Sequence, residues 1–598
     1  MCGISCIIKK EGTITHSQIK AMNDIVAHRG PDGEGFYIDN NIALGHRRLA
    51  IIDLSTDGNQ PMPYNDDLVI VFNGEIYNYI ELRQQLIEKG HHFKTLSDTE
   101  VILVAYTEWG EQCVNYFNGM WSFCLYDKKK QKVFCSRDRF GVKPFYYSHK
   151  NDQFYIGSEI KQIIHFFDKK IANIERLTGF LIGSPGHQDE TFFKDVHQLR
   201  QGHNLIYDIK THTFEVKKFY TIAIKPEIGE LPMEQAVDGF KNLFADAIQL
   251  RLRSDVQVGT ALSGGLDSSS ISALAAHTYR GQTKFKGIHA RSSEKKGDES
   301  SFAQLVADTN NIDLHIITPT MDDFIRDIET LVKIQDEPFA GASMFMQYYV
   351  FQKAKELGCT VMLDGQGADE ILLGYHFYYA YHIKNTPLPK LWKEITDIEK
   401  NSGFSKMKQL QLATYYGLPF LRKFNLKRKA KQLINHKFLN LVGDQPFDEL
   451  CTNFSDMRDL QKNEILTSTL PLLLRYEDRN SMAHGIESRL PFMDYRLVEY
   501  ALSANISHKI HQGWTKYLLR DAMNGILPDA ITWRKDKIGF AAPQNSWLSQ
   551  TKEHILKTIS ESHILNSVLN VSSLNDIDAN TWKLYNVALW EKLYNITL

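Results

Sequence analysis

The sequence predicts two domains. The first is an α+β layered domain, and the second is an α/β domain with a doubly wound parallel sheet and a largely helical C-terminal part. The first observation is length, because 598 residues exceed the roughly 250–300 at which one hydrophobic core stops growing. The second is that short strand-like runs dominate the first third of the chain, whereas strands and helices alternate after it. The third is the stretch 220–232, which has two prolines, a glycine and no regular period and therefore separates the two patterns.

Seven short apolar runs predict the strands of the first domain, which we place at residues 1–215. They cover residues 4–10, 41–52, 67–74, 121–127, 132–138, 144–148 and 153–159. Amphipathic segments near 16–28, 79–89 and 98–109 predict helices between them. Many strands with a few helices in one block are typical of an α+β layered domain.

The second domain, placed at 235–598, shows strand–helix alternation with apolar strands. The predicted strands are 256–262, 284–290, 312–318 and 359–363, and the predicted helices are 268–280, 299–309 and two stretches up to 357. This order is the signature of a parallel, doubly wound sheet, whose ligands bind at the C-terminal ends of the strands. From about 388 onward the chain is predicted to be largely helical.

Composition narrows the classes of function. With 69 Lys and Arg against 71 Asp and Glu, the formal charge is -2, which argues against a dedicated nucleic-acid or anionic-membrane binder. The basic runs 128–130 and 427–429 are short, and we interpret them as solvated surface. Seven scattered cysteines with no C-x-x-C pair favour a reduced, cytoplasmic protein over a disulfide scaffold or zinc site. No apolar run approaches the roughly 18 residues of a membrane span, and residues 2–8 are too short for a secretory signal.

The strongest single motif is SGGLDSS at 263–269, between a predicted strand and a predicted helix. Glycines let backbone N–H groups approach an anion closely, and hydroxyls and a helix N-terminus add further donors. The motif lacks the lysine of a Walker loop. Taken alone, a two-glycine turn of this kind is equally consistent with a tight strand-to-helix turn capped by serine.

A second loop, 362–370 (MLDGQGADE), follows another predicted strand, so it should lie at the same edge of the sheet. Its acidic groups Asp364, Asp369 and Glu370 beside two glycines suit a magnesium–nucleotide site. The alternative is a helix start at which Asp369 and Glu370 complement the helix dipole.

The N-terminus reads Met1-Cys2-Gly3-Ile4. Removal of Met1 would leave Cys2 with both a thiol and a free α-amine, whose pKa of roughly 7.7–8.0 allows it to act as a base for its own nucleophile. We expect the working enzyme to lack Met1. On these four residues alone, an ordinary buried cysteine is the simpler interpretation.

Together with the segments that follow, the chain resembles the class II glutamine amidotransferases, in particular the glutamine-hydrolysing asparagine synthetases. The matching segments are MCGI, HRGPDGEG (28–35), GHRRLAIID (45–53), FNGEIYNY (72–79), SDTEVIL (97–103), GMWSFCLYD (119–127), RDRFGVKPFYY (137–147), SEIKQI (158–163), SGGLDSS, DGQGADE, DRNSMAHGIESRLPFMD (478–494) and TKYLLR (515–520). The resemblance implies an αββα sandwich of the N-terminal-nucleophile hydrolase type, followed by an adenine nucleotide alpha hydrolase-like domain.

For the first domain, the resemblance implies that Cys2 attacks the glutamine side-chain amide. Asn73, through its side chain, and Gly74, through its backbone N–H, would form the oxyanion hole. The resemblance further implies that Arg48 binds the α-carboxylate of glutamine and that Glu75 and Asp98 receive its α-ammonium. Each residue has a simpler reading; Asp98, for example, lies within a capping box at a helix start.

For the second domain, the resemblance implies that ATP is a substrate and that Mg²⁺ accompanies it. The implied ATP- and pyrophosphate-binding residues are Ser263, Gly264, Gly265, Leu266, Asp267, Ser268, Asp364 and Gly365. Asp267 and Asp369 would approach the magnesium, and Lys516 would stabilise charge during adenylation. Arg479 and Arg489 are weaker candidates for the same surface.

Joined, the halves predict an ATP-dependent amidation in which ammonia travels internally to an acyl-adenylate. The implied reaction converts aspartate, glutamine, ATP and water to asparagine, glutamate, AMP and diphosphate. One residue departs from the family pattern: Gln366 stands where many relatives have glutamate, and an amide cannot accept a proton. Either Asp364 substitutes, or no side-chain base is needed, or the acceptor is another carboxylate, such as a uronic-acid sugar in surface polysaccharide synthesis. The partners expected are thus small molecules, with no nucleic acid or membrane, and a homodimer is left open.

Overall fold

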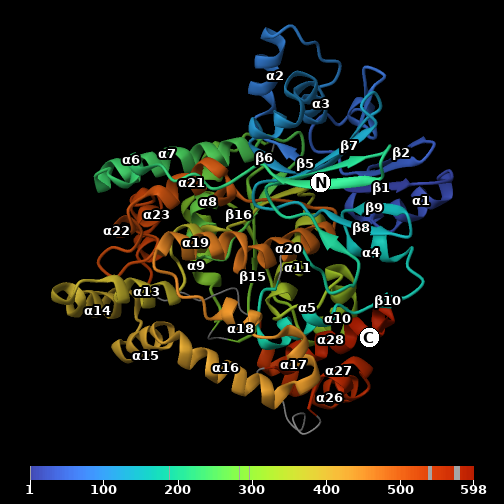
Figure 1. The fold of residues 1–598 in the computed structure, drawn as a ribbon. Helices are drawn as coiled ribbons and strands as arrows, with labels where there is room; N and C mark the ends of the chain where they lie inside the picture. The colour runs from blue at the N-terminus through green and yellow to red at the C-terminus, as the bar shows by residue number, and fades with distance from the viewer. Residues whose placement is uncertain (1, 187–188, 282, 295–296, 536–541, 571–579) are drawn as a thin grey trace.

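The computed structural model describes residues 2–186, 189–281, 283–294, 297–535, 542–570 and 580–598 (Figure 1). The N-terminal third forms a body of strands at one side of the molecule, and helices make up most of the remainder. Within the described ranges, the structure has no helix that is both apolar enough and long enough to span a bilayer.

Two six-stranded sheets form the N-terminal domain. The first has the order β11-β8-β9-β1-β3-β2, with β1 Gly3–Lys9, β2 Gly33–Asp39, β3 Ile42–Arg48, β8 Tyr146–Lys150, β9 Gln153–Gly157 and β11 His197–Gln198. The second has the order β13-β12-β7-β6-β5-β4, with β4 Met62–Tyr64, β5 Leu68–Ile76, β6 Gly119–Asp127, β7 Lys132–Arg137, β12 His203–Asp208 and β13 Thr213–Lys218.

Alternation along the strands explains how the two sheets stack. Successive side chains of a strand point to opposite faces of its sheet. In β1, Ile4 packs with Val69 of β5 in the layer between the sheets, whereas Ile7 belongs to a cluster on the outer face. In β5, Ile70 packs on the outside against α3 (Asp98–Trp109). This arrangement confirms the predicted sandwich.

Helices cover both outer faces of the sandwich. The helices α1 (His16–Asp24) and α4 (Ile160–Ile164) contribute to the cluster outside the first sheet. The helices α2 (Tyr79–Glu88) and α3 cover the second sheet. The layers are therefore helix, sheet, sheet, helix.

The second domain is built on a five-stranded parallel sheet of order β16-β15-β14-β17-β18. The strands are β14 Val258–Ala261, β15 Lys286–Ala290, β16 Asp313–Ile317, β17 Val361–Leu363 and β18 Glu487–Arg489. The chain runs outward from β14 through β15 to β16 and then returns to the other side of β14 as β17. The strand order therefore reverses between β14 and β17, the position at which doubly wound sheets bind ligands.

The predicted helices of this domain are present. They are α8 Leu266–Thr278, α9 Ser300–Thr309, α10 Met321–Gln335 and α11 Ser343–Glu356. Beyond them the chain is largely helical, as predicted, and ends in α28 (Thr581–Tyr594) followed by the short strand β19 (Ile596–Thr597). β19 pairs in parallel with β10 (Lys170–Ile171), so the chain returns to the N-terminal third.

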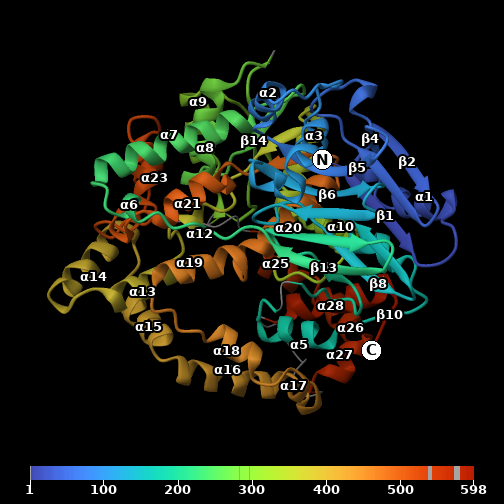
Figure 2. The same cartoon turned by 45° about the horizontal axis from the view of Figure 1, so that its top comes forward.

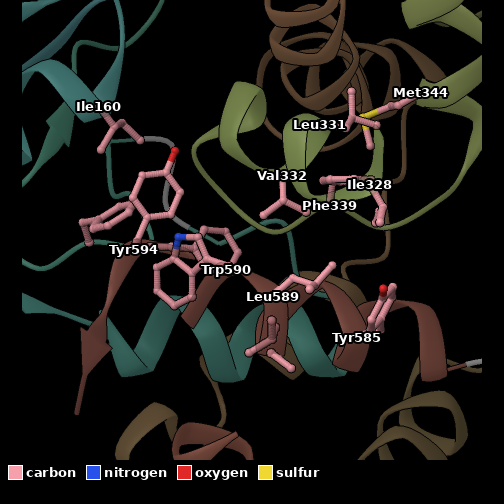
Figure 3. Packing of buried hydrophobic residues seen from close by; sticks show 14 of the residues in the cluster. Ile160, Ile328, Leu331, Val332, Phe339, Met344, Tyr585, Leu589, Trp590 and Tyr594 are labelled. Atoms are coloured by element: carbon pink, nitrogen blue, oxygen red, sulfur yellow. The ribbon is translucent and has the colours of Figure 1, made fainter. Parts of the chain in front are cut away.

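One hydrophobic cluster joins the two halves. It contains Ile160 from α4, Ile328 from α10 and Trp590 from α28, all fully or almost fully buried. Figure 3 shows Trp590 and Tyr594 beside Ile160, with the side chains of α10 above the last helix. The halves share part of a core, so their relative position is fixed by packing as well as by the connecting chain.

Candidate active sites

The first site lies where strands of the two stacked sheets meet. Cys2 immediately precedes β1, and Asn73 lies on β5 of the other sheet. The backbone N–H of Cys2 donates to Oδ1 of Asn73 over 2.9 Å. The amide nitrogen Nδ2 of Asn73 is buried without a hydrogen-bond partner among the described residues, so a donor next to the cysteine is still available.

Gly74 follows Asn73 where the backbone passes very close to β6. A Cβ atom on Gly74 would lie 2.1 Å from the carbonyl oxygen of Met120 and 2.8 Å from Cα of Trp121. No side chain fits in that space. The sequence pair Asn-Gly therefore reflects a steric requirement of this strand pair rather than a surface turn.

Arg48, the last residue of β3, is buried beside the cysteine. Its guanidinium donates to the side chain of Asn59 over 2.9 Å, to the carbonyl of Ser55 over 2.6 Å and to the carbonyl of Asp53. Three neutral acceptors hold its orientation but leave its charge without a carboxylate partner in these bonds. Such a fixed guanidinium suits the recognition of a carboxylate ligand.

Two buried carboxyls face the same region. Asp98 begins α3 and accepts from the backbone N–H of Ile76 over 2.9 Å, and burial raises its pKa to about 6. Burial and the nearby Asp98 raise the pKa of Glu75 well above its usual value. Glu75 also forms an ion pair with Arg489 of the second domain, at 3.0 Å. Two close carboxyls that both resist ionisation provide a favourable place for a cation.

The predicted residues of this first site are brought together. One cavity is lined by Cys2, Arg48, Leu49, Ile51, Ile52, Gly58, Gln60, Phe72, Gly74, Glu75, Ser97, Asp98 and Thr99. Burial raises the pKa of the Cys2 thiol, which therefore stays neutral near physiological pH. Met1 lies outside the described residues, so the expectation that it is removed stays a prediction.

The second site is centred on the loop between β14 and α8. Gly264 has φ +82°, and a Cβ there would lie 2.8 Å from the backbone nitrogen of Ala303. The hydroxyls of Ser263 and Ser268 are 2.8 Å apart, and the N–H of Gly265 donates to Oγ of Ser263 over 3.2 Å. These bonds close the loop over the N-terminus of a 13-residue helix, where backbone N–H groups favour an anion.

The second predicted loop lies directly beside the first, because β17 pairs with β14. Asp364 follows β17 and accepts a hydrogen bond from the N–H of Gly365 over 2.5 Å. Together with the 263–268 loop it lines a second cavity, separate from the one around Cys2. Burial raises the pKa of Asp364 to about 6. Gln366, the residue that departs from the family pattern, lines this cavity too.

Sequence reasoning missed Glu477, a buried carboxyl on α20 (Thr469–Met482). It accepts hydrogen bonds from Gln347 and, over 2.5 Å, from Oγ of Ser488. Burial and the nearby Asp364 raise its pKa well above the usual value, so the pair holds one proton near neutral pH. A glutamate on a helix one residue before the 478–494 motif carries no signal of burial, and only the fold reveals it.

Lys516 lies between the two loops. Its ammonium is 2.5 Å from Asp267 and 2.7 Å from Asp369. Burial would lower its pKa, but these two carboxylates raise it above its usual value, so it remains charged. The backbone of Lys516 has φ +54°, an uncommon conformation for a lysine and typical of residues held at functional sites.

The acidic groups of this site suit magnesium brought in with a nucleotide. Mg²⁺ usually takes one or two carboxylates together with substrate phosphates and water. Asp267 and Asp369 supply two carboxylates, and the buried Oδ1 of Asp267 has no hydrogen-bond partner among the described residues. Within the described ranges, no three His, Cys, Asp or Glu side chains form a cluster able to hold a metal ion.

Most of the predicted nucleotide site lines one cavity. Its walls include Ser263, Gly265, Leu266, Asp267, Ser268, Asp364, Gly365, Asp369 and Lys516, and further residues such as His376, Tyr379, Asn401, Ser402, Trp514, Arg520 and Arg534 that sequence reasoning did not select. Gly264 lies in the same loop, although its atoms do not line the wall.

Arg479 and Arg489 do not lie beside Lys516 as expected. Arg479 pairs with Glu159 at 3.0 Å and Asp336 at 3.1 Å, at the contact between the domains. Arg489 connects the two sites instead. Its side chain reaches Glu75 in the first, and its backbone carbonyl accepts from the N–H of Asp364 in the second, over 3.0 Å.

Comparison with known proteins identifies both domains. Residues 1–220 match the family model "Glutamine amidotransferase domain", and residues 239–591 match "Asparagine synthase". The chain is 30% identical to Asparagine synthetase [glutamine-hydrolyzing] 3 of Bacillus subtilis (strain 168), over 96% of this chain and 93% of that protein. It is 32% identical to Asparagine synthetase [glutamine-hydrolyzing] 1 of the same organism, over 94% and 90%. It is also 26% identical to Amidase chry2 of Gibberella zeae, over 92% and 90%. The chain therefore belongs to the glutamine-hydrolysing asparagine synthetase family and is a ligase that couples a glutamine amidotransferase domain to an asparagine synthase domain.

Proposed function

We propose that this enzyme makes asparagine from aspartate, with glutamine as the nitrogen donor and ATP as the activating substrate. The observation that carries the proposal is that one chain holds two cavities, one lined by Cys2 and Arg48 and the other by the 263–268 loop, and that Arg489 contacts a wall residue of each, Glu75 and Asp364. A free glutaminase would not need the second cavity, and an adenylating enzyme without a nitrogen source would not need the first.

In the first cavity, the Cys2 thiol attacks the side-chain amide of glutamine. Once Met1 is removed, the α-amine of Cys2 accepts the thiol proton and later delivers a proton to the departing ammonia. Nδ2 of Asn73 and the N–H of Gly74 stabilise the oxyanion of the tetrahedral intermediate. Water then releases glutamate from the thioester.

The charged residues of the first cavity hold the substrate. Arg48 binds the α-carboxylate of glutamine, since its guanidinium is already oriented by neutral acceptors. Glu75 and Asp98 bind the α-ammonium, which replaces the repulsion between the two carboxyls by attraction to a cation.

In the second cavity, an acceptor carboxylate oxygen attacks the α-phosphorus of ATP. The bond to the β-phosphate oxygen breaks, pyrophosphate leaves, and an acyl-adenylate forms. The 263–268 loop holds the pyrophosphate at the N-terminus of α8, and Lys516 balances negative charge at the reacting phosphate. Mg²⁺, held by Asp267 and Asp369, would supply additional charge stabilisation when bound.

Ammonia then attacks the acyl carbon, AMP leaves, and the nitrogen loses one proton to reach the neutral amide. Gln366 cannot accept this proton. Asp364 is the carboxylate of the cavity wall with a pKa of about 6, so it is ionised at neutral pH and basic enough to accept it. Glu477, buried behind it, keeps its proton and positions the neighbouring Gln347 and Ser488.

Gln366 also favours a second candidate, in which the acceptor is a different carboxylate such as a uronic-acid sugar. The experiment is product identification by mass spectrometry, with ATP, ¹⁵N-amide glutamine and a panel of carboxylates that includes aspartate and uronic-acid sugar nucleotides. Labelled asparagine with stoichiometric AMP is expected. If glutamate forms without asparagine and a labelled amide of another carboxylate appears, that carboxylate is the acceptor in place of aspartate, and the proposed mechanism is unchanged.

A further inference from the structure

Three consecutive helices carry an unusual share of exposed apolar side chains. They are α14 (Leu388–Ser402), α15 (Lys406–Gly417) and α16 (Pro419–Leu433), here called the basic arm, and they follow one another along the outer edge of the molecule (Figures 1 and 2). Nine of the 21 large apolar side chains exposed in the described ranges lie in these 46 residues: Leu388, Trp392, Met407, Leu410, Tyr415, Leu418, Phe420, Leu421 and Phe424. Patches of this kind mark interaction surfaces.

The same 46 residues concentrate positive charge. They contain eleven Lys and Arg and only three Asp and Glu, a formal charge of +8 in a chain whose total is -2. The near-neutral total therefore conceals a strongly basic region. The run 427–429, interpreted from sequence as solvated surface, is one part of it.

Helical spacing places the two kinds of residue together. In α16, Phe420, Phe424, Arg428 and Lys431 follow one another at intervals of four, four and three residues, so they share one face. Phe420 is 78% exposed and Phe424 is 60% exposed. Leu418, the single residue between α15 and α16, is exposed as well.

Part of the charge is already neutralised by ion pairs. Lys423 and Lys427 pair with Asp444, and Lys423 also pairs with Asp448 at 2.5 Å. In contrast, Arg428 and Lys429 are exposed. The outer face of α16 therefore presents phenylalanines next to exposed cations.

We propose that the basic arm docks on the surface of an anionic lipid bilayer, with its aromatic and aliphatic side chains in the headgroup region and its lysines and arginines against lipid phosphates. Exposed Trp, Phe and Leu beside Lys and Arg match the chemistry of helices that lie in a membrane interface. A second copy of the chain is the less favourable partner, since a symmetric contact would oppose +8 to +8. Nucleic acid would account for the cations but not for exposed Leu388, Met407 and Leu410.

The test is flotation of the full-length protein with phosphatidylcholine vesicles and with vesicles of equal parts phosphatidylcholine and phosphatidylglycerol. We expect co-flotation with the anionic vesicles only, weakening as salt is raised. Phe420→Ser/Phe424→Ser should reduce binding at least about tenfold, because the variant lacks two large apolar side chains whose transfer from water into the bilayer favours binding. Arg428→Glu/Lys429→Glu should reduce it by at least a similar factor, since two attractive charges become repulsive.

Matched controls exist within the chain. Ile87→Ser/Ile325→Ser removes two exposed apolar side chains outside the arm, and Lys128→Glu/Lys129→Glu reverses the charges of the other basic run. Both should bind vesicles like the unmodified protein. Glutaminase activity and far-ultraviolet circular dichroism show that each variant is folded.

Three results would overturn the proposal: no binding of the unmodified protein to anionic vesicles, equal loss in the control variants, or equal binding by the arm variants. A concentration-dependent dimer in light scattering, lost in Phe420→Ser/Phe424→Ser and accompanied by no vesicle binding, would assign the arm to contact between copies instead.

Discussion

At the scale of single residues, Cys2 allows the most direct test of the proposed chemistry. Cys2→Ala should abolish glutamine-dependent synthesis and leave synthesis from ammonium salts intact, because only the nitrogen source is lost. Amide product measured with each donor separates the two activities. Cys6→Ala is the matched control: Cys6 is buried on β1, which begins directly after Cys2, but it packs between the sheets, so both activities should remain. Amide synthesis from glutamine by Cys2→Ala would show that Cys2 is not the nucleophile.

Asp98 gives glutamine binding a pH dependence. Burial raises its pKa to about 6, so below that pH the carboxyl is neutral and attracts the α-ammonium of glutamine only weakly. The KM for glutamine should therefore rise as pH falls through about 6, approaching about tenfold per pH unit. For stability the sign is opposite: the neutral form suits the buried site, and this contribution is lost as pH rises through about 6.

The measurement is steady-state glutaminase kinetics from pH 5 to 8, in which the KM for glutamine is compared between the unmodified enzyme and Asp98→Asn. Asp98→Asn should raise KM about 10- to 100-fold at neutral pH, the loss of one charge-assisted bond, and flatten the profile. A profile that is unchanged in Asp98→Asn would assign the titration to another group.

Asp364 carries the proton-transfer prediction. Asp364→Asn should leave glutaminase activity unchanged and lower amide synthesis about 100-fold or more, the usual contribution of a general base. Pre-steady-state quenching should show the acyl-adenylate accumulating, since its formation needs no base. Gln366→Glu in the Asp364→Asn background places a carboxylate on the same wall and should restore part of the rate. Loss of adenylate formation itself would instead make Asp364 a nucleotide-binding residue.

At the scale of elements, the loop between β14 and α8 depends on the backbone of Gly264. Gly264→Ala introduces a side chain at φ +82° that would lie 2.8 Å from Ala303, so the loop must shift. We expect synthesis to fall at least about 100-fold with glutaminase intact, because a displacement of about 1 Å at a reacting group has that cost.

Gly358→Ala is the control for backbone strain. Gly358 has a similar φ of +75°, but a Cβ there meets nothing within 4 Å. Both variants should lose about 1–3 kcal/mol of stability, measured by urea unfolding, and only Gly264→Ala should lose activity. Equal activity in the two variants would show that the loop does not position the phosphates.

The sequence predicted many of the elements whose local signals and tertiary context agree, although it missed the buried β12. The parallel strands β14, β15 and β17 are mostly buried, and their apolar runs exceed the actual strands by only two or three residues: 256–262 was expected and β14 covers 258–261. By contrast, β2 and β13 were missed, because their residues are mostly exposed or half-buried and their composition is polar. Strands of this kind are specified by pairing with a neighbour, which no local pattern records.

The same distinction applies to the sites. Residues that the sequence selected within contiguous motifs, such as Cys2, Gly74 and Asp267, line the two cavities, and their roles stay predictions. Glu477 and the connection through Arg489 were not, because each depends on strands and helices that are distant in sequence. Their contacts arise from β18 lying next to β17, a consequence of topology.

At the scale of the whole molecule, transfer of ammonia between two cavities requires that the halves keep a fixed relation. The hydrophobic cluster around Trp590 helps to fix the position of one half relative to the other. Charge helps as well: Arg29, fully buried, pairs with Asp478 of the second domain at 2.8 and 3.0 Å and with Glu159 at 2.9 Å. Buried pairs of this kind have demanding geometry, so they specify one arrangement of the two halves.

Asp478→Asn should therefore disturb the coupling between the sites more than either reaction. It leaves Arg29 buried with one carboxylate fewer, at an expected loss of about 3–5 kcal/mol of stability. Ammonia should escape, so the ratio of glutamate to AMP, expected near one in the unmodified enzyme, should rise. The matched control is Glu81→Ala, which breaks the interdomain pair of Glu81 with Arg253; Glu81 is 55% exposed, so stability should change by about 0–1 kcal/mol and the ratio should not move. A ratio that stays near one in Asp478→Asn, with the predicted loss of stability, would show that the shared core alone keeps the two cavities in register.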